Sequence, residues 1–344
     1  MSRILQVVGR ASGGVVGHVT DVVETLKASG EDVLVAAPEG EFPSSIHQVP
    51  LAIGARPSRE DVGAIARLRG IMKGADAVHA HGLRAGAFAV LAGWGMRRRP
   101  RIVVTEHNLP VGGRAVRAIG WTLETIVARG ADCILGVSPD LVERARTLGA
   151  RDADLALVPA PKRRGDADVS RDPQSLLTIA RLAPQKGLDL ALDAAGILAR
   201  DGYTFSWSIA GDGPEGDHLA QRIRDEKLPV TLLGRRDDIA TLLARCGIVV
   251  QASLWEGQPL SIQEALAAGC AIVATDVGGT RAVTGDAARL VAPDGAALAQ
   301  AIASLLDRPE DAEDLRKRAR TRFAELPQRS DVLAQLRACY ALGE

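Results

Sequence analysis

Short β-rich apolar runs alternate with longer helical patterns along this chain of 344 residues, and the alternation occurs twice. Such a pattern predicts parallel sheets covered by helices on both faces. In the first half, the expected strands are residues 4–9, 31–38, 77–82, 101–107, 133–138 and 155–160. In the second half, they are residues 175–180, 205–211, 230–234, 248–253, 271–277 and 288–292. The predicted fold class is therefore α/β, with two doubly wound, Rossmann-like domains.

The alternation is interrupted by the Pro-, Gly- and charge-rich stretch at 161–174. This composition is typical of a linker between domains. We predict an N-terminal domain at 1–162 and a C-terminal domain at 163–325, facing each other across a ligand-binding cleft. The tail is helical without strands. Its last part, 326–344, is predicted to form a helix that packs back on the first domain.

Composition narrows the class of protein. Apolar residues make up 47% and charged residues 24%, as in packed globular proteins. The sequence has no run of about 18 uncharged apolar residues, and its start is too rich in Gly to resemble a signal peptide. Aromatic residues make up 3%, which argues against nucleic-acid binding. The four cysteines, Cys133, Cys246, Cys270 and Cys339, lack metal-like or redox-motif spacing. Cys133, Cys246 and Cys270 fall at expected strand or helix ends, so we expect them to be buried free thiols, and we expect a cytoplasmic location.

Two cations follow the expected strand at 175–180, in the segment Ala180-Arg-Leu-Ala-Pro-Gln-Lys-Gly187. Arg181 offers a planar fork for phosphate oxygens, and Lys186 offers a compact charge. Gly187 opens the next helix, whose free N–H groups also favour anions. The segment is a candidate diphosphate site; the alternative is a solvated basic loop.

Two glutamates lie around a predicted helix start in Ser253-Leu-Trp-Glu-Gly-Gln-Pro-Leu-Ser-Ile-Gln-Glu-Ala265. The segment joins two apolar strands, so it falls at the sheet edge where open α/β sheets bind ligands. Pro259 suits the first helical position, which would leave the amides of Leu260 and Ser261 free for an anion. Glu256 and Glu264 could then accept hydrogen bonds from hydroxyl groups on either side of bound phosphates. The alternative is a capping carboxylate and a surface glutamate.

A third glycine-rich segment, Ala210-Gly-Asp-Gly-Pro-Glu-Gly216, matches the dinucleotide fingerprint G-x-G-x-x-G. It follows the second strand of its domain, and Asp212 would bring negative charge to the pyrophosphate turn. An NAD(P)-dependent oxidoreductase that uses Gly211–Gly216 therefore stays an alternative function.

Together these segments resemble the GT-B retaining glycosyltransferases of family 4. The resemblance rests on ARLAPQKG, GDGP, EGQPLSIQEA and ATDVGG in the second half, and on ASGGVVGHV, VHAHG and TEHN in the first. The implied activity is the transfer of a sugar from a nucleoside-diphosphate sugar to a hydroxyl group. A catalytically silent GT-B nucleotide-binding protein, and a nucleotide-sugar epimerase or hydrolase, are further alternatives.

The resemblance implies roles in the second domain. Arg181 and Lys186 would bind the donor diphosphate, Glu256 the hydroxyls of the transferred sugar, and Glu264 the ribose. Main chain around Gly234 and Arg235 would face the base. The remaining donor-binding candidates are Gly257, Leu260 and Ser261.

In the first domain, backbone at Gly13 and Gly14 would approach the diphosphate, because only glycine permits such close contact. His107 would lie beside the transferred sugar, which makes it a catalytic candidate together with Arg181, Lys186 and Glu256. His18 and Arg114 are candidates for contact with the acceptor. His79 and His81 are expected to be structural.

The family's chemistry retains anomeric configuration by attack on the face that the nucleotide leaves, without a protein nucleophile. We expect no cofactor and no metal, since Asp152-Ala-Asp154 and Asp166-Ala-Asp168 flank a strand and a linker. UDP-sugars are the first expectation for the donor and GDP-sugars the second. The expected acceptor is a glycan or lipid-linked glycan of the cell envelope. Ala252, the end of the first domain and TRAV after Gly279 depart from the family pattern.

The first half of the chain is basic: residues 1–165 hold 22 Lys and Arg against 16 Asp and Glu. Arg97–Arg101 and the predicted helix near Arg114–Trp121 place cations beside apolar residues. These could seat an anionic membrane surface, which predicts a peripheral position at the inner face of the membrane. The alternative is a solvated edge over a buried apolar stripe.

Overall fold

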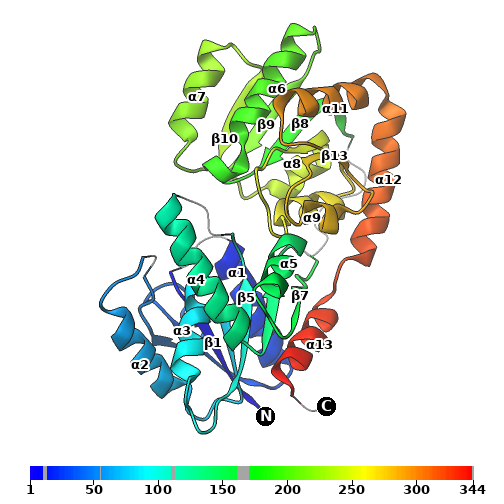
Figure 1. Ribbon diagram of the computed structural model, residues 1–344. Coiled ribbons are helices and arrows are strands. Elements are labelled where there is room, and N and C mark those ends of the chain that lie inside the picture. Colours follow the sequence, from blue (N-terminus) through cyan, green and yellow to red (C-terminus); the bar gives the residue numbers. More distant parts are fainter. Residues whose placement is uncertain (11–13, 55, 110–112, 161–169, 343–344) are drawn as a thin grey trace. The chain divides into compact units, whose positions relative to one another are not determined.

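The computed structural model describes residues 1–344 except 11–13, 55, 110–112, 161–169 and 343–344. Two compact units can be followed in Figure 1: residues 1–159 with 327–344, and residues 160–326. The divisions fall at 159/160 and 326/327, against 162/163 and 325/326 in the sequence-based assignment. Most of the predicted linker, 161–169, lies outside the described residues. Within the described ranges, no helix is long and apolar enough to cross a lipid bilayer.

The first unit is built on a seven-stranded parallel sheet in the order β3-β2-β1-β4-β5-β6-β7. Its strands are β1 (Arg3–Val8), β2 (Asp32–Ala37), β3 (Gln48–Pro50), β4 (Ala77–His81), β5 (Arg101–Glu106), β6 (Cys133–Gly136) and β7 (Ala153–Leu155). Its helices are α1 (Gly14–Ala28), α2 (Asp61–Ile71), α3 (Leu83–Gly93), α4 (Arg114–Gly130), α5 (Pro139–Thr147) and α13 (Arg329–Tyr340). The Val-, Ile- and Leu-rich runs form strands because helices cover both faces of the sheet.

The second unit holds a six-stranded parallel sheet in the order β10-β9-β8-β11-β12-β13. Its strands are β8 (Asp172–Ile179), β9 (Ser206–Ala210), β10 (Val230–Gly234), β11 (Cys246–Gln251), β12 (Ala271–Thr275) and β13 (Arg289–Val291). Its α-helices are α6 (Leu188–Arg200), α7 (Gly216–Asp225), α8 (Ile239–Arg245), α9 (Leu260–Ala267), α10 (Thr280–Thr284), α11 (Gly295–Asp307) and α12 (Pro309–Glu325), and a short 3-10 turn, η1 (Pro184–Lys186), precedes α6.

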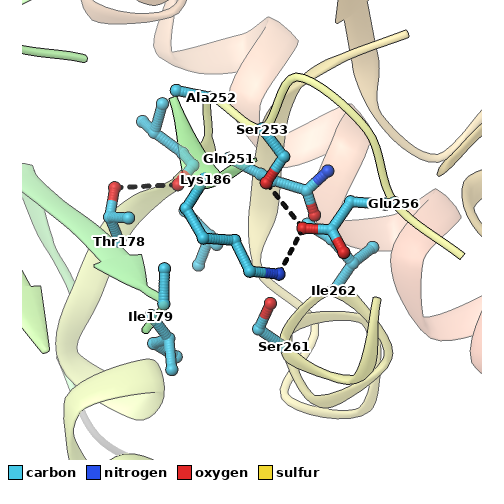
Figure 2. A pocket seen from close by; sticks show the side chains of 12 residues that line it. Thr178, Ile179, Lys186, Gln251, Ala252, Ser253, Glu256, Ser261 and Ile262 are labelled. Carbon is cyan, nitrogen blue, oxygen red and sulfur yellow. Dashed lines mark hydrogen bonds and ion pairs between the residues drawn. The ribbon is translucent and has the colours of Figure 1, made fainter. Parts of the chain in front are cut away.

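Each sheet has a point where the strand order reverses. It lies between β1 and β4 in the first unit and between β8 and β11 in the second. Open α/β sheets bind ligands at the carboxyl ends of strands at such a point. In the second unit, a small pocket lies beside the ends of β8 and β11 (Figure 2). The strand order therefore brings the segments that begin at Ala180 and Ala252 to one place.

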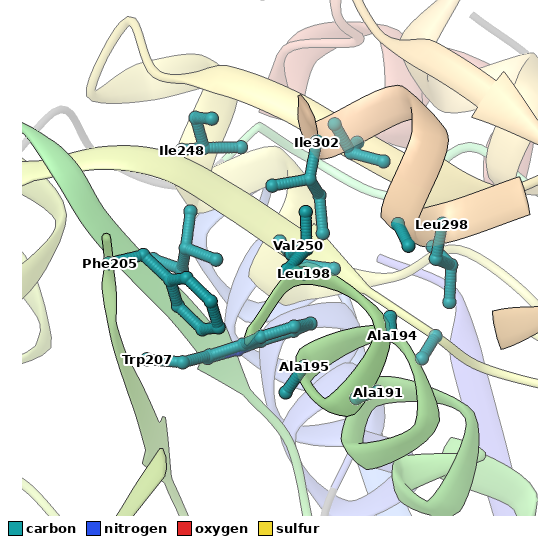
Figure 3. Close-up of a cluster of buried hydrophobic side chains, with 14 of the residues drawn as sticks. Ala191, Ala194, Ala195, Leu198, Phe205, Trp207, Ile248, Val250, Leu298 and Ile302 are labelled. Atoms are coloured by element: carbon teal, nitrogen blue, oxygen red, sulfur yellow. The ribbon is translucent and has the colours of Figure 1, made fainter. Parts of the chain in front are cut away.

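One face of the second sheet carries a large apolar core (Figure 3). Trp207 of β9 is 1% exposed and packs with residues of α6 and α11, among them Ala194, Ala195, Leu198, Leu298 and Ile302. Its indole Nε1 donates to Thr178 Oγ1 at 3.0 Å, and that hydroxyl donates to Val250 O at 2.8 Å. The buried indole N–H of Trp207 and the hydroxyl of Thr178 are thus both paired, as buried polar groups in folded proteins usually are.

The expected strand at 155–160 is wrong. The strand that forms, β7, covers Ala153–Leu155 and pairs with β6. At the end of β7 the backbone bonds the C-terminal helix instead: Leu157 N donates to Gln335 Oε1, and Gln335 Nε2 donates to Leu155 O, both at 2.8 Å. The short edge strand β3 was not predicted, and β8 begins at Asp172, inside the expected linker.

The C-terminal helix α13 belongs to the first unit, where it contacts β5 and α1 (Figure 1). The predicted α/β class and the predicted return of this helix to the first domain are confirmed. All four cysteines are free and buried, which confirms the expectation for Cys133, Cys246 and Cys270.

Candidate functional site

The loop after β8 and the loop after β11 are bound to each other. Leu254 N donates to Gln185 O at 2.8 Å, and Gln185 Nε2 donates to Trp255 O at 2.9 Å. Gly187 lies between the loops with a φ of +58°, and a Cβ on it would stand 2.2 Å from Ala252 O. A larger residue would separate the loops, so the glycine fixes the relation between the cationic segment and the glutamate segment.

Lys186 and Glu256 form an ion pair across these loops. Lys186 Nζ lies 2.6 Å from Glu256 Oε1, and Ser253 Oγ donates to the same oxygen at 2.5 Å (Figure 2). Glu256 is 6% exposed, so its carboxylate is held by a charge and a hydroxyl rather than by bulk water. The structure thus brings together two residues that the sequence analysis placed in separate segments.

The Glu256 loop is supported from behind by the segment after β12. Gly279 N donates to Glu256 O at 2.9 Å, and Thr275 Oγ1 donates to Ser253 O at 2.6 Å. Gly278 has a φ of +52°, and a Cβ there would stand 1.9 Å from Glu256 O. In the sequence, ATDVGG contributed only to the family resemblance. The structure shows that its first glycine, Gly278, is required, because the main chain of Glu256 occupies the space that a side chain would need.

Gln251, the last residue of β11, is a pocket residue that the sequence analysis missed. It is 6% exposed and lines the pocket, and its Nε2 donates to Thr280 Oγ1 at 3.2 Å. Its Oε1 has no hydrogen-bond partner among the residues that the structure describes. A buried amide oxygen without a partner can accept a hydrogen bond from a ligand or from water. The sequence feature that could have identified Gln251 is that it is the one polar residue at the end of the apolar run IVVQ.

Helix α9 begins beside the ion pair. Its first residue is Leu260, and Pro259 precedes it as the N-cap in an extended conformation, which corrects the position expected for Pro259 by one residue. Pro259 O accepts from the amides of Ile262 and Gln263, both at 3.1 Å. The amides of Leu260 and Ser261 lie ahead of these bonds, where a helix leaves its N–H groups free. Ser261 lines the pocket, and Glu264 lies one helical turn further on, partly buried.

The glycine-rich segment Ala210–Gly216 supports the loop that carries Arg181. Leu182 N donates to Asp212 O at 2.8 Å, and Gly211 N donates to Gly234 O at 2.8 Å. A Cβ on Gly211 would stand 1.9 Å from Ala180 O. Gly211 and Gly213 of the G-x-G-x-x-G match therefore serve close backbone packing. Arg181 and Arg235 are exposed, and Gly234 has a φ of +66° with open space around its Cα.

The first unit gathers four histidines at its own switch point. His79 and His81 lie in β4, His107 follows β5, and His18 lies in α1. His79 bonds Tyr340 Oη and Thr105 Oγ1, both at 2.7 Å, while His81 Nε2 bonds Gln6 Oε1 at 2.8 Å. His81 Nδ1 lies 3.4 Å from His107 Nε2.

Burial keeps these four imidazoles neutral. Desolvation lowers the pKa of His18 to about 4; desolvation first, and then the neighbouring His18, lowers the pKa of His79 to about 3. The pKa values of His81 and His107 lie well below the usual value for the same two reasons, burial and neighbouring histidines. His18 and His107 keep some surface accessibility, but the surrounding protein atoms still make desolvation the main cause.

The other candidates of the first unit are dispersed. Gly14 is the exposed first residue of α1, and Arg114 is exposed at the start of α4. Gly13 and the pair Asp166 and Asp168 lie outside the described residues, while Asp154 lies in β7.

Comparison with known proteins gives the family. Residues 161–322 match the family described as glycosyl transferases group 1, and residues 13–161 match the glycosyl transferase 4-like domain. The chain belongs to the group 1 glycosyltransferases. The predicted resemblance is confirmed on both halves.

Two curated relatives of this glycosyltransferase align with part of it. The amylovoran biosynthesis glycosyltransferase AmsK of Erwinia amylovora is 31% identical over 157 residues, which cover 42% of this chain and 38% of the relative. Glycogen synthase of Mycobacterium tuberculosis is 32% identical over 158 residues, which cover 44% of this chain and 38% of the relative. The chain thus matches about two fifths of the length of these relatives.

Solved structures share the fold over the whole chain. Anabaena Alr3699/HepE in complex with UDP and glucose gives a TM-score of 0.80 at 18% identity, covering 99% of this chain and 100% of that chain. TarM also gives a TM-score of 0.80, at 12% identity, covering 99% of each chain. The predicted GT-B fold is confirmed.

Proposed function

We propose that this glycosyltransferase moves a sugar, with retention of anomeric configuration, from a nucleoside-diphosphate sugar to a hydroxyl group. The observation that carries the proposal is the Lys186–Glu256 ion pair beside the N-terminus of α9, in the pocket at the switch point of the second sheet. This arrangement supplies a cation and helix amides for phosphates and a carboxylate for hydroxyls within one pocket.

Lys186 can serve the diphosphate without leaving Glu256, because an ammonium group has three donors. Arg181 is exposed, and its guanidinium makes no hydrogen bond or ion pair within the part of the chain that the structure describes. It is therefore available to a second phosphate. We assign the hydroxyls of the transferred sugar to Glu256 and those of the ribose to Glu264. Gly234, Arg235, Gly257, Leu260 and Ser261 keep their expected donor-side roles.

In the proposed reaction the acceptor hydroxyl attacks the anomeric carbon on the face from which the nucleotide departs, and the leaving phosphate takes the acceptor's proton. Arg181, Lys186 and the α9 amides would stabilise the charge that develops on the leaving diphosphate. Protein cations in this position make a metal unnecessary for the transfer. His107 and the Gly13–Gly14 backbone are assigned to the donor from the first unit, and His18 and Arg114 to the acceptor.

We infer UDP as the first donor nucleotide and GDP as the second. The solved neighbours in complex with UDP, or with UDP-glucose, support UDP. A glycan or lipid-linked glycan of the cell envelope is the proposed acceptor. Relatives named for amylovoran biosynthesis and for glycosylating poly(ribitol-phosphate) are consistent with that class.

We also propose that α4 contacts an anionic membrane at the cytoplasmic face. Val116, Ile119 and Trp121 are 50%, 44% and 55% exposed, and Arg114 and Arg117 lie on the same helix. Exposed apolar residues beside cations are typical of surfaces that enter the headgroup region. Sedimentation with phosphatidylglycerol vesicles should retain the wild type and lose a Trp121→Ser, Arg117→Glu variant. Equal sedimentation of the two would refute this contact.

A thermal-shift series tests the donor site. UDP, GDP, ADP and NAD are each titrated against the wild type, Glu264→Ala and the control Glu310→Ala, an exposed glutamate at the start of α12. A ligand at 100 times its Kd stabilises by about 2.7 kcal/mol, which raises the midpoint by several degrees. We expect UDP to stabilise the wild type and Glu310→Ala, and to stabilise Glu264→Ala much less. Stabilisation by NAD alone, indifferent to Glu264, would overturn the transferase and favour the oxidoreductase.

Turnover of the UDP-sugar that binds most tightly then separates an active enzyme from a silent binding protein. Lys186→Ala should lower kcat by about 10²–10³-fold, because the leaving diphosphate loses a stabilising donor. Lys186→Arg, which keeps the charge, should lose less. Binding without turnover in the wild type, across UDP-sugars and GDP-sugars, would favour the silent alternative.

A further inference from the structure

Three histidines of the first unit converge from separate elements. The nearest ring nitrogens of His18, His81 and His107 all lie within 4.8 Å of one another. His81 is at the carboxyl end of β4, His107 just beyond β5, and His18 on α1. The ring centroid of His18 lies 5.7 Å from that of His81 and 5.2 Å from that of His107. Since α1 follows β1, the three histidines come from both sides of the switch point between β1 and β4 and from the neighbouring β5.

The spacing of two of these nitrogens matches a tetrahedral metal site. Zn–N distances of about 2.0–2.1 Å place neighbouring ligand nitrogens about 3.3 Å apart. His81 Nδ1 and His107 Nε2 are 3.4 Å apart. His18, which is partly exposed on α1, needs a side-chain rotation to bring its nitrogen to the same spacing.

Hydrogen bonds around His81 turn a lone pair toward that point. Gln6 Nε2 donates to Tyr340 Oη, which leaves Gln6 Oε1 as the acceptor for His81 Nε2–H at 2.8 Å. With the proton on Nε2, Nδ1 of His81 faces His107 as an acceptor. A hydrogen-bonded second nitrogen is the usual means of orienting a histidine ligand. His79 is excluded as a ligand, since both of its nitrogens bond protein oxygens.

A purely hydrogen-bonded role accounts for the cluster less well. His107 could donate to His81, but 3.4 Å is long for an N–H···N bond. Within the described residues, His18 has ring contacts but no hydrogen-bond partner. Three imidazoles, two of them without a good partner, point at a common centre.

We propose that His18, His81 and His107 bind a divalent transition metal, with Zn²⁺ as the first choice. Imidazole nitrogens favour Zn²⁺, Co²⁺, Ni²⁺ and Cu²⁺ over the hard ions Mg²⁺ and Ca²⁺. Three ligands leave one position open for water or for a substrate oxygen. The partial exposure of His18 and His107 gives the ion a path of entry. The site shares His107 and His18 with the proposed donor and acceptor contacts, but its test measures metal binding and needs no turnover.

The test is binding of Zn²⁺ and Co²⁺ to the full chain after removal of metals with a chelator. Calorimetry measures Zn²⁺ stoichiometry and affinity, and the visible spectrum of Co²⁺ reports the ligands. We expect one equivalent per chain and d–d bands without the charge-transfer band that a thiolate would add. His18→Ala should weaken Zn²⁺ binding on the order of 100-fold. The controls are His47→Ala and His218→Ala, two exposed histidines, which should bind as the wild type does.

Absence of saturable binding, a thiolate charge-transfer band, or unchanged affinity in His18→Ala would overturn the site. Circular dichroism checks that His18→Ala is folded; His18→Phe, which keeps a ring on α1, replaces it if it is not. Zn²⁺ binding in a protein that binds no nucleotide would sustain this inference and defeat the transferase proposal. Nucleotide binding without metal binding would overturn the metal site and leave the transferase proposal standing.

Discussion

Glu256 is a buried carboxylate whose main chain is as constrained as its side chain. Its side chain is held by Lys186 and Ser253, and its carbonyl accepts from Gly279 N at 2.9 Å. The chain passes Gly278 at a φ of +52°, directly against that carbonyl. Any residue with a Cβ at 278 would therefore move Glu256.

Gly278→Ala should destabilise the protein by more than about 3 kcal/mol, because it adds a backbone clash to a left-handed conformation. The matched control is Gly202→Ala: its φ is +86°, but a Cβ there meets nothing within 4 Å. The control should cost about 1 kcal/mol, from conformation alone. Urea denaturation measures both. Equal losses would mean that the Glu256 loop yields and is no fixed support.

Helix α13 is joined to the first sheet by polar contacts as well as by packing. Tyr340, 2% exposed, bonds His79 at 2.7 Å, and Arg337 forms an ion pair with Glu31 at 3.3 Å. The free thiols of Cys133 and Cys339 lie 2.9 Å apart. The helix is thus part of the first unit's core, although 160–326 separate it from the rest of that unit.

Tyr340→Phe should lower the free energy of unfolding by about 1–3 kcal/mol, since it leaves His79 Nδ1 buried without a partner. The control is Tyr203→Phe, which removes the same hydroxyl group at a site open to water. The Tyr203 hydroxyl donates to Asp307 at 2.8 Å where water can replace it, so this loss should be within about 0.5 kcal/mol. Two similar losses, measured by denaturation, would contradict a structural role for the buried hydroxyl.

The two units should differ in their response to acid. The first holds the four histidines with lowered pKa values, and in the second unit the described residues include one histidine, His218, which is exposed. Between the folded pKa values and about 6.5, the unfolded chain binds protons that the folded unit does not. Stability is therefore complete above pH 6.5 and falls as the pH falls, by up to about 1.4 kcal/mol per pH unit for each histidine.

Glu106 acts in the opposite direction. Burial, and then Glu124, raise its pKa to about 7, so the folded state gains a proton first and is stabilised as the pH falls from 7 toward 4.5. The stabilisation from this one carboxyl group offsets the loss of stability from about one of the four histidines. Scanning calorimetry with a chelator present should show two unfolding transitions, of which the one that Tyr340→Phe shifts belongs to the first unit. When the pH falls from 6.5 to 5, the midpoint temperature of that transition should fall relative to the midpoint of the second unit's transition. Parallel movement of both transitions would be evidence against this assignment.

The sequence by itself determined the class of fold, most strand positions and the chemical nature of the segments proposed to bind the donor. These properties are local: the periodicity of apolar residues specifies strand or helix, and Arg181, Lys186, Glu256 and Glu264 lie in short segments of recognisable composition. The family followed from the same segments. The expectation failed at 155–160, where backbone atoms of Leu155 and Leu157 bond Gln335 of α13 and the strand does not continue.

Only the tertiary structure decided which distant residues meet. The ion pair joins residues 70 positions apart, and the Gln6–Tyr340 bond spans 334 positions. The unpartnered oxygen of Gln251 and the convergence of His18, His81 and His107 likewise depend on which strands become neighbours. Strand order is a long-range choice that depends on how helices cover the whole sheet, and local periodicity carries no record of it.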